Sequence, residues 1–336
     1  MKLERLREIL ALASGRRIAV AGDLMLDQFV WGKVGRISPE APVPVVQVTG
    51  ESSYPGGAAN VARNLREFTS EVAVVGTVGT DENGRHLLEL LREQKIETNL
   101  VLEDPEFPTI VKTRIIARHQ QVVRVDRENI QAPTNSQAAK IAAELREAVS
   151  RLNAFIFEDY GKGFLSPGLV TQISADLNAA GKIITADPNP HRAIDWGRVT
   201  AIKPNRVEAL QAAGLPVSDP IDPPSEDGPL LAAGAKLLES WDTQLLLITL
   251  GEQGMMLFER NVAPHHIPTK ARQVFDVSGA GDTAIALFTL ALSCGASPIE
   301  AAEISNHASA VVVGKLGTAT VTPAELIASF EDDNDA

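Results

Sequence analysis

The sequence predicts an α/β protein in which helices cover a mainly parallel sheet and a small mixed sheet stands apart from it. Short apolar runs of the strand type alternate with helical patterns along most of the chain, which is typical of parallel α/β layers. Two segments break this alternation: 42–49 is rich in proline, and 111–126 has the two-residue alternation of exposed strands. No repeat of fixed period occurs.

The elements of the main layer follow in chain order. Leu3, Leu6, Ile9 and Leu10 recur at helical spacing before Gly15, which indicates an amphipathic helix. Buried strands are expected where apolar residues run together between turn residues. The expected strands are 17–21, 72–75, 154–158, 182–186 and 245–250, and the expected helices lie around 84–94, after Pro167 and after Gly281.

The two exceptional segments predict a lid. Proline lacks the N–H group that a sheet ladder needs, so 42–49 suits an edge strand. Alternation in 111–126 turns Lys112 and Arg114 to the same face. We therefore expect one domain over residues 1–336, whose segments of about 28–50 and 108–127 form a small β subdomain that is available as a lid or as the surface of a homodimer.

Composition narrows the classes of function. The 336 residues carry a net charge of −12, from 31 basic and 43 acidic side chains. Such a field repels phosphate backbones and anionic lipid, which disfavours nucleic-acid and membrane partners. Cys294 is the only cysteine, which excludes a disulfide framework and a cysteine-rich metal site. The first seventeen residues contain no apolar signal core, so we expect a cytoplasmic protein.

The strongest local motif is Asp276-Val277-Ser278-Gly279-Ala280-Gly281-Asp282, which opens an apolar helix. Small residues let backbone amides crowd an anion, and the helix N-terminus adds its positive end. Asp282 would lie in the first turn, where a carboxylate suits general-base work on a hydroxyl that attacks a γ-phosphate. Helix capping explains the same aspartate equally well, so spacing alone leaves both interpretations open.

A second glycine motif, Gly56-Gly57-Ala58-Ala59-Asn60, opens an earlier helix. Paired glycines allow the main chain to approach a ligand closely, and Asn60 can exchange hydrogen bonds with sugar hydroxyls. Taken alone, a glycine turn with close helix packing is the commoner explanation. The chain has no G-x-x-x-x-G-K-[ST] motif, which excludes a P-loop, and no G-x-G-x-x-G after its first strand, which weakens a dinucleotide-binding interpretation.

Three further groups of polar residues have both a chemical and a structural interpretation. Asn205 and Glu208 share a face at a helix start, where their oxygens suit a hydrated Mg²⁺, but the pair is an equally good capping box. The run Asp187-Pro188-Asn189-Pro190 at a strand end is more typical of a turn. The basic residues of the lid segment suit a clamp for a substrate phosphate, although a solvated sheet face is the commoner explanation. They are Lys112, Arg114, Arg118, Arg124 and Arg127.

Together these motifs resemble the ribokinase-like (PfkB) carbohydrate kinase family over residues 17–322. The two glycine motifs match the two family signatures in order and separation, and Asn205-x-x-Glu208 matches a third. The run Thr249-Leu250-Gly251-Glu252-Gln253-Gly254 resembles the nucleotide-site turn of the family. The resemblance implies a three-layer α/β/α sandwich with a small β-sheet lid, and it favours the general base among the interpretations of Asp282.

The resemblance also implies the role of each site residue in an ATP- and Mg²⁺-dependent sugar kinase. Asp282 is the implied base, and the amides of Gly279, Ala280 and Gly281 form the implied anion hole. Contacts with a phosphorylated sugar are implied for Asp23, Asp27, Gly56, Gly57, Asn60, Lys112, Arg118, Arg124 and Lys162. Thr249, Gly251, Gly254 and Asn306 would hold ATP, Asn205 and Glu208 would hold Mg²⁺ through water, and Asp276 would contact a monovalent cation such as K⁺.

Within the family, the chain is most similar to the kinases that phosphorylate O1 of D-glycero-β-D-manno-heptose 7-phosphate in ADP-heptose synthesis. The runs 22–27, 36–45, 118–126 and 159–163 carry this similarity, whereas Glu158, Gly161 and His119 depart from it. Bifunctional relatives continue into a nucleotidyltransferase domain with an H-x-G-H motif. No such motif occurs in this chain, so we expect the kinase half alone.

Three rival functions stay open on the sequence. The nearest is another kinase of the family, acting on fructose 6-phosphate, ribose, a nucleoside or 2-keto-3-deoxygluconate. A catalytically silent sugar- or nucleotide-binding protein should have lost the base or the glycines of the anion hole, but Asp282 and its three neighbours are present. A Rossmann oxidoreductase lacks its phosphate-binding fingerprint.

Overall fold

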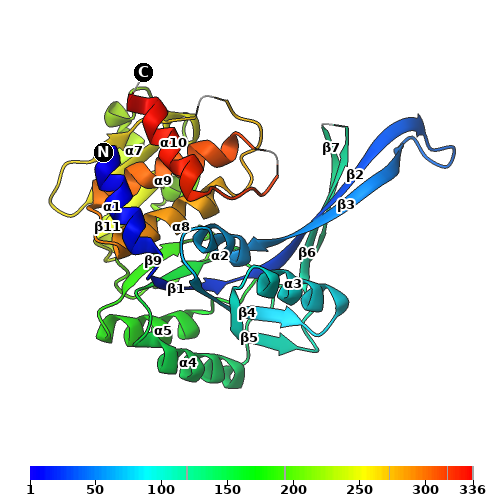
Figure 1. Ribbon diagram of the computed structural model, residues 1–336, viewed down its shortest axis with the longest axis horizontal. Helices are drawn as coiled ribbons and strands as arrows, with labels where there is room; N and C mark the ends of the chain where they lie inside the picture. Colours follow the sequence, from blue (N-terminus) through cyan, green and yellow to red (C-terminus); the bar gives the residue numbers. More distant parts are fainter. Residues whose placement is uncertain (119, 193, 272, 316, 335–336) are drawn as a thin grey trace.

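The computed structural model describes residues 1–118, 120–192, 194–271, 273–315 and 317–334, so His119 of the lid run lies outside the described residues. Within them, one large sheet has the order β13-β12-β11-β10-β9-β8-β1-β4-β5 (Figure 1). Its strands from β5 to β11 are parallel, and β12 and β13 extend one edge antiparallel. The bounds are β1 (Arg17–Gly22), β4 (Glu71–Gly79), β5 (Glu97–Asp104), β8 (Ala154–Glu158), β9 (Ile183–Asp187), β10 (Ala201–Ile202), β11 (Leu245–Thr249), β12 (Met255–Glu259) and β13 (His265–Ile267).

Helices cover both faces of this sheet, which confirms the predicted three-layer α/β/α arrangement. One face carries α1 (Leu3–Ala13), α2 (Ala58–Arg66), α3 (Glu82–Glu93), α8 (Ala280–Ser293), α9 (Pro298–Val313) and α10 (Pro323–Asn334). The other carries α4 (Asn135–Val149), α5 (Pro167–Ala179), α6 (Arg206–Ala212) and α7 (Gly228–Ser240). Figure 1 shows α4 and α5 below the sheet and α1, α8, α9 and α10 above it. None of the described helices combines the length and the apolar character that a membrane crossing requires.

The two-residue period of the central strands divides their side chains between the two helical layers. In β1, Ile18 and Val20 belong to the core cluster beneath α2 and α8, whereas Ala19 and Ala21 belong to the cluster on the other face. The α/β prediction therefore succeeds because each central strand is apolar on both sides.

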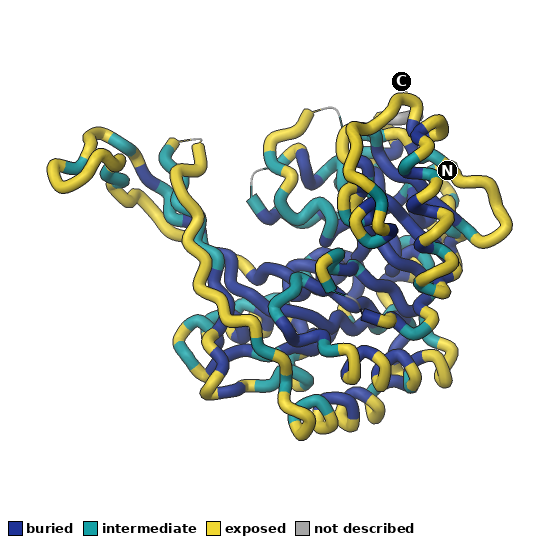
Figure 2. Tube along the Cα trace, turned by 180° about the vertical axis from the view of Figure 1, so that it is seen from behind, coloured by how far each residue is buried: buried dark blue, intermediate teal, exposed yellow. Residues whose placement is uncertain are grey.

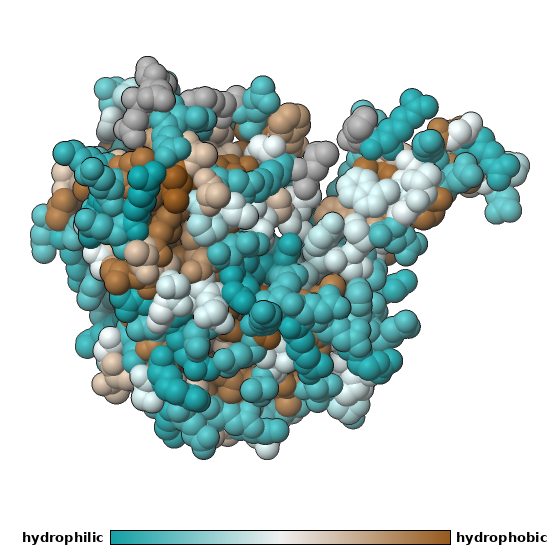
Figure 3. Space-filling model, viewed as in Figure 1, coloured by the Kyte–Doolittle hydropathy of each residue, from teal (hydrophilic) through white to brown (hydrophobic). Residues whose placement is uncertain are grey.

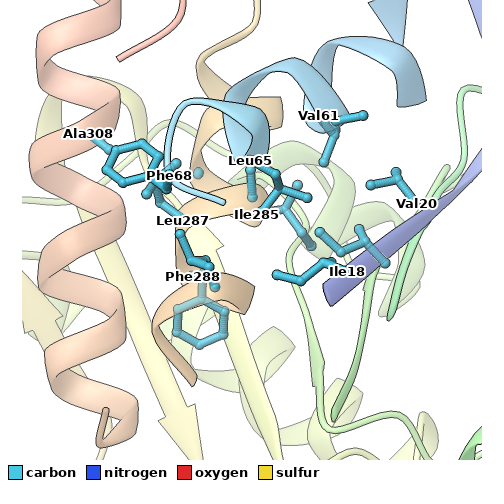
Figure 4. Close-up of a cluster of buried hydrophobic side chains, with 14 of the residues drawn as sticks. Ile18, Val20, Val61, Leu65, Phe68, Ile285, Leu287, Phe288 and Ala308 are labelled. Atoms are coloured by element: carbon cyan, nitrogen blue, oxygen red, sulfur yellow. The ribbon is translucent and has the colours of Figure 1, made fainter. Parts of the chain in front are cut away.

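The packing of α2 against α8 places the two glycine motifs together. Figure 4 shows Val61 and Leu65 of α2 near Val20 of β1 and Ile285 of α8. All four side chains are fully buried. Because these two helices start on the same side of the core, residues at their N-termini are brought into contact although they are more than 200 positions apart in sequence.

A second sheet, which we call the lid, projects from the body as an arm (Figures 1 and 3). Its order is β3-β2-β6-β7, formed by β2 (Leu24–Ile37), β3 (Pro44–Gly57), β6 (Ile110–Ala117) and β7 (Gln120–Arg127). Residues 44–49 of the proline-rich segment lie in β3, an edge strand antiparallel to β2, while β6 runs parallel to β2. Figure 2 shows the lid buried where it joins the body and exposed toward its far end. The lid strands reach beyond the expected segment 28–50, from Leu24 to Gly57.

Candidate active site

Two glycines shape the helix starts that meet beside the lid. Gly279 is the N-cap of α8 and has φ +78°, and Gly57 is the N-cap of α2 with φ +60°. A Cβ at Gly279 would lie 2.8 Å from Asn60 Nδ2, and a Cβ at Gly57 would lie 2.5 Å from the Asp23 carbonyl oxygen. Both positions therefore require glycine, for conformation and for space.

The loop before α8 is held by one carboxylate. Asp276 accepts hydrogen bonds from the N–H groups of Ser278 and Gly317 at 2.9 and 3.1 Å. The Ala280 N–H donates to the Val277 carbonyl at 3.2 Å. The first N–H groups of a helix have no partner within the helix, so this N-terminus suits an anion, but Ala280 is already engaged.

Asp282 lies in the first turn of α8 with 6% of its surface exposed. Its Oδ2 atom accepts a hydrogen bond from Asn60 Nδ2 at 2.7 Å, and its Oδ1 atom accepts one from the Tyr160 hydroxyl at 2.7 Å. Burial raises the pKa of Asp282, while the two hydrogen bonds and the Lys203 ammonium oppose the rise. The carboxylate is thus fixed at two points and has a raised pKa, as a general base at neutral pH needs.

The amide of Asn60 is engaged by protein groups at both of its polar atoms. Besides the bond to Asp282, its Oδ1 atom accepts a hydrogen bond from Arg63 at 3.1 Å. One turn further along α2, Asn64 Oδ1 accepts a hydrogen bond from the Thr283 hydroxyl at 3.0 Å. Polar bonds as well as apolar packing therefore lock α2 to α8.

An acidic cluster borders Asp282 at the carboxyl ends of neighbouring strands. Glu158 ends β8, Asp187 ends β9 and Lys203 follows β10. Lys203 Nζ lies 2.7 Å from Asp187 Oδ2. Burial raises the pKa of Asp187 to about 7, and burial together with the Asp187 carboxylate raises the pKa of Glu158 well above its usual value. Glu158 Oε2 is buried without a hydrogen-bond partner among the described groups.

Sequence reasoning missed Tyr160, Glu158 and Lys203, and interpreted the segment at Asp187 as a turn. Each follows or ends one of the consecutive parallel strands β8, β9 and β10. Ligand sites of open α/β sheets lie at the carboxyl ends of strands. These site residues could therefore have been identified from the sequence, because polar or charged residues occur at the ends of successive predicted strands.

Two aspartates near the start of the lid are used differently. Asp23 is 3% exposed and accepts hydrogen bonds from three backbone N–H groups of the loop 160–164, at 2.9 to 3.1 Å. Asp27 lies on β2 and forms an ion pair with Arg114. Gly56 packs against Asp27 so closely that a Cβ there would lie 2.2 Å from the carboxylate Oδ2 atom.

Cross-strand pairing gathers charged residues on the face of the lid that looks toward Tyr160. Residues opposite one another on neighbouring strands share a face. The register places Lys112 between Asp27 and Asp126, and Arg114 between Phe29 and Arg124. Arg124 makes two hydrogen bonds of 2.9 Å to Asp126. Lys112 Nζ lies 5.6 Å from the Tyr160 ring centroid and has no carboxylate hydrogen bond within the described part of the chain. Three cations thus face two carboxylates, and Lys112 is the surplus charge.

The other basic residues predicted for the substrate are placed differently. Lys162 forms an ion pair of 2.7 Å with Glu128 beside the lid. Arg118 is exposed at the end of β6, six residues beyond Lys112, which corresponds to roughly 20 Å along a strand. The structure therefore brings Lys112, Arg114 and Arg124 together near Tyr160 and leaves Arg118 apart.

Asn205 and Glu208 form the capping box of α6. Asn205 Oδ1 accepts the Glu208 N–H at 2.9 Å, and Glu208 Oε2 accepts the Asn205 N–H at 2.8 Å. Glu208 also contributes to the raised pKa of Asp187, so it lies within electrostatic reach of the acidic cluster. The orphaned Glu158 oxygen and this excess of acid fit a hydrated divalent cation. Among the residues that the structure describes, no three acidic, histidine or cysteine side chains could hold a metal directly, so water would complete its shell.

The residues predicted for ATP line one cavity of about 480 Å³ between the turn after β11 and α9. Thr249, Gly251, Gly254 and Asn306 all border it, and so does Gly281 of the glycine motif. Apolar side chains complete the walls, among them Val274, Val277, Ala310 and Val313. The cavity therefore suits a planar apolar group at one end and leads to the α8 N-terminus, where an anion is favoured.

Comparison with known proteins gives a family match and curated relatives that are longer than this chain. The model of the pfkB family of carbohydrate kinases matches residues 16–325. A curated protein named Bifunctional protein HldE from Geobacter metallireducens is 41% identical over 339 aligned positions, which cover 100% of this chain and 68% of that protein. The chain spans 66% and 62% of the proteins of the same name from Geobacter sulfurreducens and Pelobacter propionicus, so it corresponds to about two thirds of these relatives.

Solved structures share the fold at low sequence identity. Phosphofructokinase-2 from Escherichia coli in complex with potassium has a TM-score of 0.76 at 17% identity, covering 94% of this chain and 98% of that chain. Arabidopsis thaliana ribokinase complexed with ribose and ATP has a TM-score of 0.72 at 17% identity, covering 94% and 99%. These matches confirm the predicted ribokinase-like fold class.

Proposed function

This chain belongs to the pfkB family of carbohydrate kinases and is an ATP-dependent sugar kinase, and we propose that it phosphorylates O1 of D-glycero-β-D-manno-heptose 7-phosphate. The product would be the 1,7-bisphosphate, in ADP-heptose synthesis. The heptose-kinase runs in the sequence support this substrate. The observation that carries the proposal is the surplus ammonium of Lys112, which lies over the ring of Tyr160, while the hydroxyl of the same tyrosine bonds the buried Asp282.

Asp282 is the general base in this proposal. Its carboxylate takes the proton of the O1 hydroxyl as that oxygen attacks the γ-phosphorus of ATP, and the bond to the β-phosphate oxygen breaks to release ADP. Each carboxylate oxygen accepts one hydrogen bond in the structure, so a lone pair is left for the substrate hydroxyl. The N–H groups of Gly279 and Gly281 stabilise the charge that moves onto the phosphates.

The sugar is assigned to the space between the α2 start and the lid. Asp27, Gly56 and Gly57 border it, and Lys112 with Arg124 receives the 7-phosphate. Asp23 and Asn60 are assigned to positioning and not to sugar contact, because Asp23 holds the loop 160–164 and Asn60 holds Asp282. Lys162 and Arg118 contribute less, since Lys162 is already paired and Arg118 lies toward the lid end.

ATP is assigned to the cavity between Thr249 and Asn306, with its phosphates directed to Gly281. Asn205 and Glu208 would hold Mg²⁺ through water. The ion would neutralise part of the phosphate charge when it is bound. Asp276 is the proposed contact of a monovalent cation such as K⁺, through the loop that it folds.

The lid also supports a homodimer. Its outer strands β3 and β7 have unpaired edges within the described chain, and an unpaired edge is a template for another strand. Exposed apolar side chains accompany both edges: Val43, Val48, Val122, Val123 and Val125. A second copy of the chain would cover these residues.

The experiment is ADP release with Mg-ATP across four sugars: D-glycero-β-D-manno-heptose 7-phosphate, fructose 6-phosphate, ribose and 2-keto-3-deoxygluconate. We expect selective turnover of the heptose phosphate. Turnover of another sugar would retain the kinase and contradict the substrate and the role of the lid cations. Tight ATP binding with no turnover of any sugar would favour a binding protein.

A further inference from the structure

Tyr160 is fixed in position by its backbone. It follows β8, and its N–H donates to Asp23 Oδ2 at 3.1 Å. The same aspartate accepts the N–H groups of Lys162 and Phe164 at 2.9 and 3.1 Å, and Asp159 Oδ1 accepts that of Gly161 at 2.8 Å. A loop with four such bonds to buried carboxylates holds its side chains in a defined place.

The hydroxyl end of Tyr160 meets the carboxylate of Asp282. The Tyr160 hydroxyl donates to Oδ1 at 2.7 Å while Asn60 Nδ2 donates to Oδ2 at 2.7 Å. The two donors come from different elements, one from the loop after β8 and the other from α2. Because each oxygen has its own donor, the carboxylate cannot rotate without breaking a hydrogen bond to a charged group.

We propose that Tyr160 is a positioning residue that orients Asp282 and keeps it ionised for phosphoryl transfer. This inference rests on the proposed role of Asp282 as the base. A carboxylate that is oriented before the substrate arrives lies closer to the geometry of the transition state. Tyr160 touches the base and is not required to touch the sugar.

The charges around Asp282 explain why a second donor is needed. Glu158 and Asp187 at the ends of β8 and β9, and Asp27 on β2, each disfavour a further negative charge there, whereas Lys203 after β10 favours it. Burial raises the pKa of Asp282 and the bonds from Asn60 and Tyr160 lower it. Burial and the neighbouring Asp282 also raise the pKa of Tyr160 well above its usual value, so its hydroxyl stays a donor at any working pH.

The ring of Tyr160 has a second contact, with the lid. Lys112 Nζ lies 5.6 Å from the ring centroid, within the range of a cation–π interaction. The side chain therefore contacts the surplus lid cation at its ring and the proposed base at its hydroxyl. Loss of the hydroxyl alone therefore removes the hydrogen bond to Asp282 and leaves the contact between the ring and Lys112 intact.

The test is the variant Tyr160→Phe, compared with Tyr54→Phe. The chain has only two tyrosines, and Tyr54 lies on β3 with its ring against Phe29 and its hydroxyl unbonded within the described residues. We expect Tyr160→Phe to lower kcat by about tenfold to a hundredfold, the range for losing a hydrogen bond to a charged group. Its KM for ATP should not change. The acid limb of the kcat–pH profile should move to higher pH, because the lost bond lowered the pKa of Asp282. Tyr54→Phe should change neither.

A double-variant cycle separates this inference from the proposed function. If Tyr160 acts through Asp282, adding Tyr160→Phe to Asp282→Asn should slow turnover no further. Multiplying losses would mean that Tyr160 acts on the substrate independently, which overturns the inference but keeps the base. Near-normal activity of Asp282→Asn would overturn the base and the inference with it. The cycle can be run on whichever sugar of the panel is turned over.

Two further results would overturn the positioning role. The first is a kcat–pH profile of Tyr160→Phe whose acid limb does not move. This result would count against the role if kcat is retained, and equally if kcat and the unfolding temperature both fall. The second comes from a measurement that needs no substrate, the pH titration of the carboxyl ¹³C resonance of Asp282, which is assigned by its loss in Asp282→Asn. We expect this resonance to titrate at higher pH in Tyr160→Phe than in the unaltered protein. An identical titration would contradict the inference even if no sugar is turned over.

Discussion

In the active centre, both carboxylate oxygens of Asp282 have a partner, whereas on the lid face the Lys112 ammonium has no carboxylate hydrogen bond among the described residues. Exposure differs between Asp282, which is 6% exposed, and the outer strand of the lid face, where the Arg124 side chain is 48% exposed. The centre is built from helix starts and strand ends of the main body, and the lid face from an arm with one side in solvent.

Under the proposed assignment, this difference separates the chemistry, at Asp282, from the recognition of the sugar phosphate, at Lys112 and Arg124. Fixed, buried groups lose little to reorganisation and suit a step that needs one geometry. An exposed cation on a sheet face can exchange its partner, as Arg124 can exchange Asp126 for a phosphate at small cost. Changes in the centre should therefore act on kcat, and changes in the lid face on the KM of the sugar.

The largest expected effect comes from Asp282→Asn. The amide keeps the shape of the side chain but cannot accept the proton, so kcat should fall by about 10²–10⁴. ATP binding, measured by calorimetry, should stay close to that of the unaltered protein because the side chain does not line the ATP cavity. Asp219→Asn, at an exposed position, is the matched control. A retained kcat would remove Asp282 from the reaction.

A smaller and more selective effect is expected from Lys112→Ala. It should raise the KM for the phosphorylated sugar about tenfold or more, as expected for a charged hydrogen bond, and leave the KM for ATP unchanged. Arg124→Ala should have a smaller effect because Asp126 already neutralises that guanidinium. Lys33→Ala, an exposed cation of β2, serves as the control. Equal changes for both substrates, or an equal change with the unphosphorylated sugar, would contradict the assignment of the phosphate.

The main sheet could be predicted from sequence because its signals are local. Each strand such as 154–158 carries its own apolar run, and each helix its own period. The motif ending in Asp282 was visible for the same reason. Its partners were not, because Asn60, Tyr160 and Asp282 lie about 100 residues apart or more and meet only through the order of the strands.

The lid shows a second limit of sequence reasoning. Alternation identified which residues of 111–126 share a face, but the register decides what lies opposite them. Arg114 was grouped with the other basic residues, yet nothing local indicates that it pairs with Asp27. Likewise Arg118 and Lys112 look equivalent in sequence, yet Lys112 contacts the Tyr160 ring and Arg118 lies six residues further along the chain, just after β6.

The smallest expected effect is on the pH dependence of the free energy of unfolding. It distinguishes the active centre from the lid face without a substrate. Burial raises the pKa of Glu158, Asp187 and Asp282 together, so the native protein holds protons that the unfolded chain releases. A carboxyl group whose folded pKa exceeds its unfolded pKa lowers the free energy of unfolding as pH rises between the two values. For Asp187 that window extends from 3.8 to about 7. The free energy of unfolding, from urea titrations, should therefore decrease from pH 5 to pH 8.

Substitutions assign this slope to the centre. Surface carboxyls such as Glu300 behave in the opposite way, because the hydrogen bond from Arg5 lowers the pKa of Glu300. The stability that such a group contributes is lost only as pH falls below the ordinary pKa of a carboxyl group. These groups therefore do not affect the window above pH 5. Glu158→Gln removes one of the buried titrating groups and should flatten the slope, whereas the exposed Glu226→Gln should not. Lys112→Ala should leave the slope unchanged, since Lys112 is not among the groups that shift the pKa values of Glu158, Asp187 and Asp282. A slope that disappears in Lys112→Ala and persists in Glu158→Gln would reverse the comparison, because the pH-dependent charge would then reside in the lid and not beside Asp282.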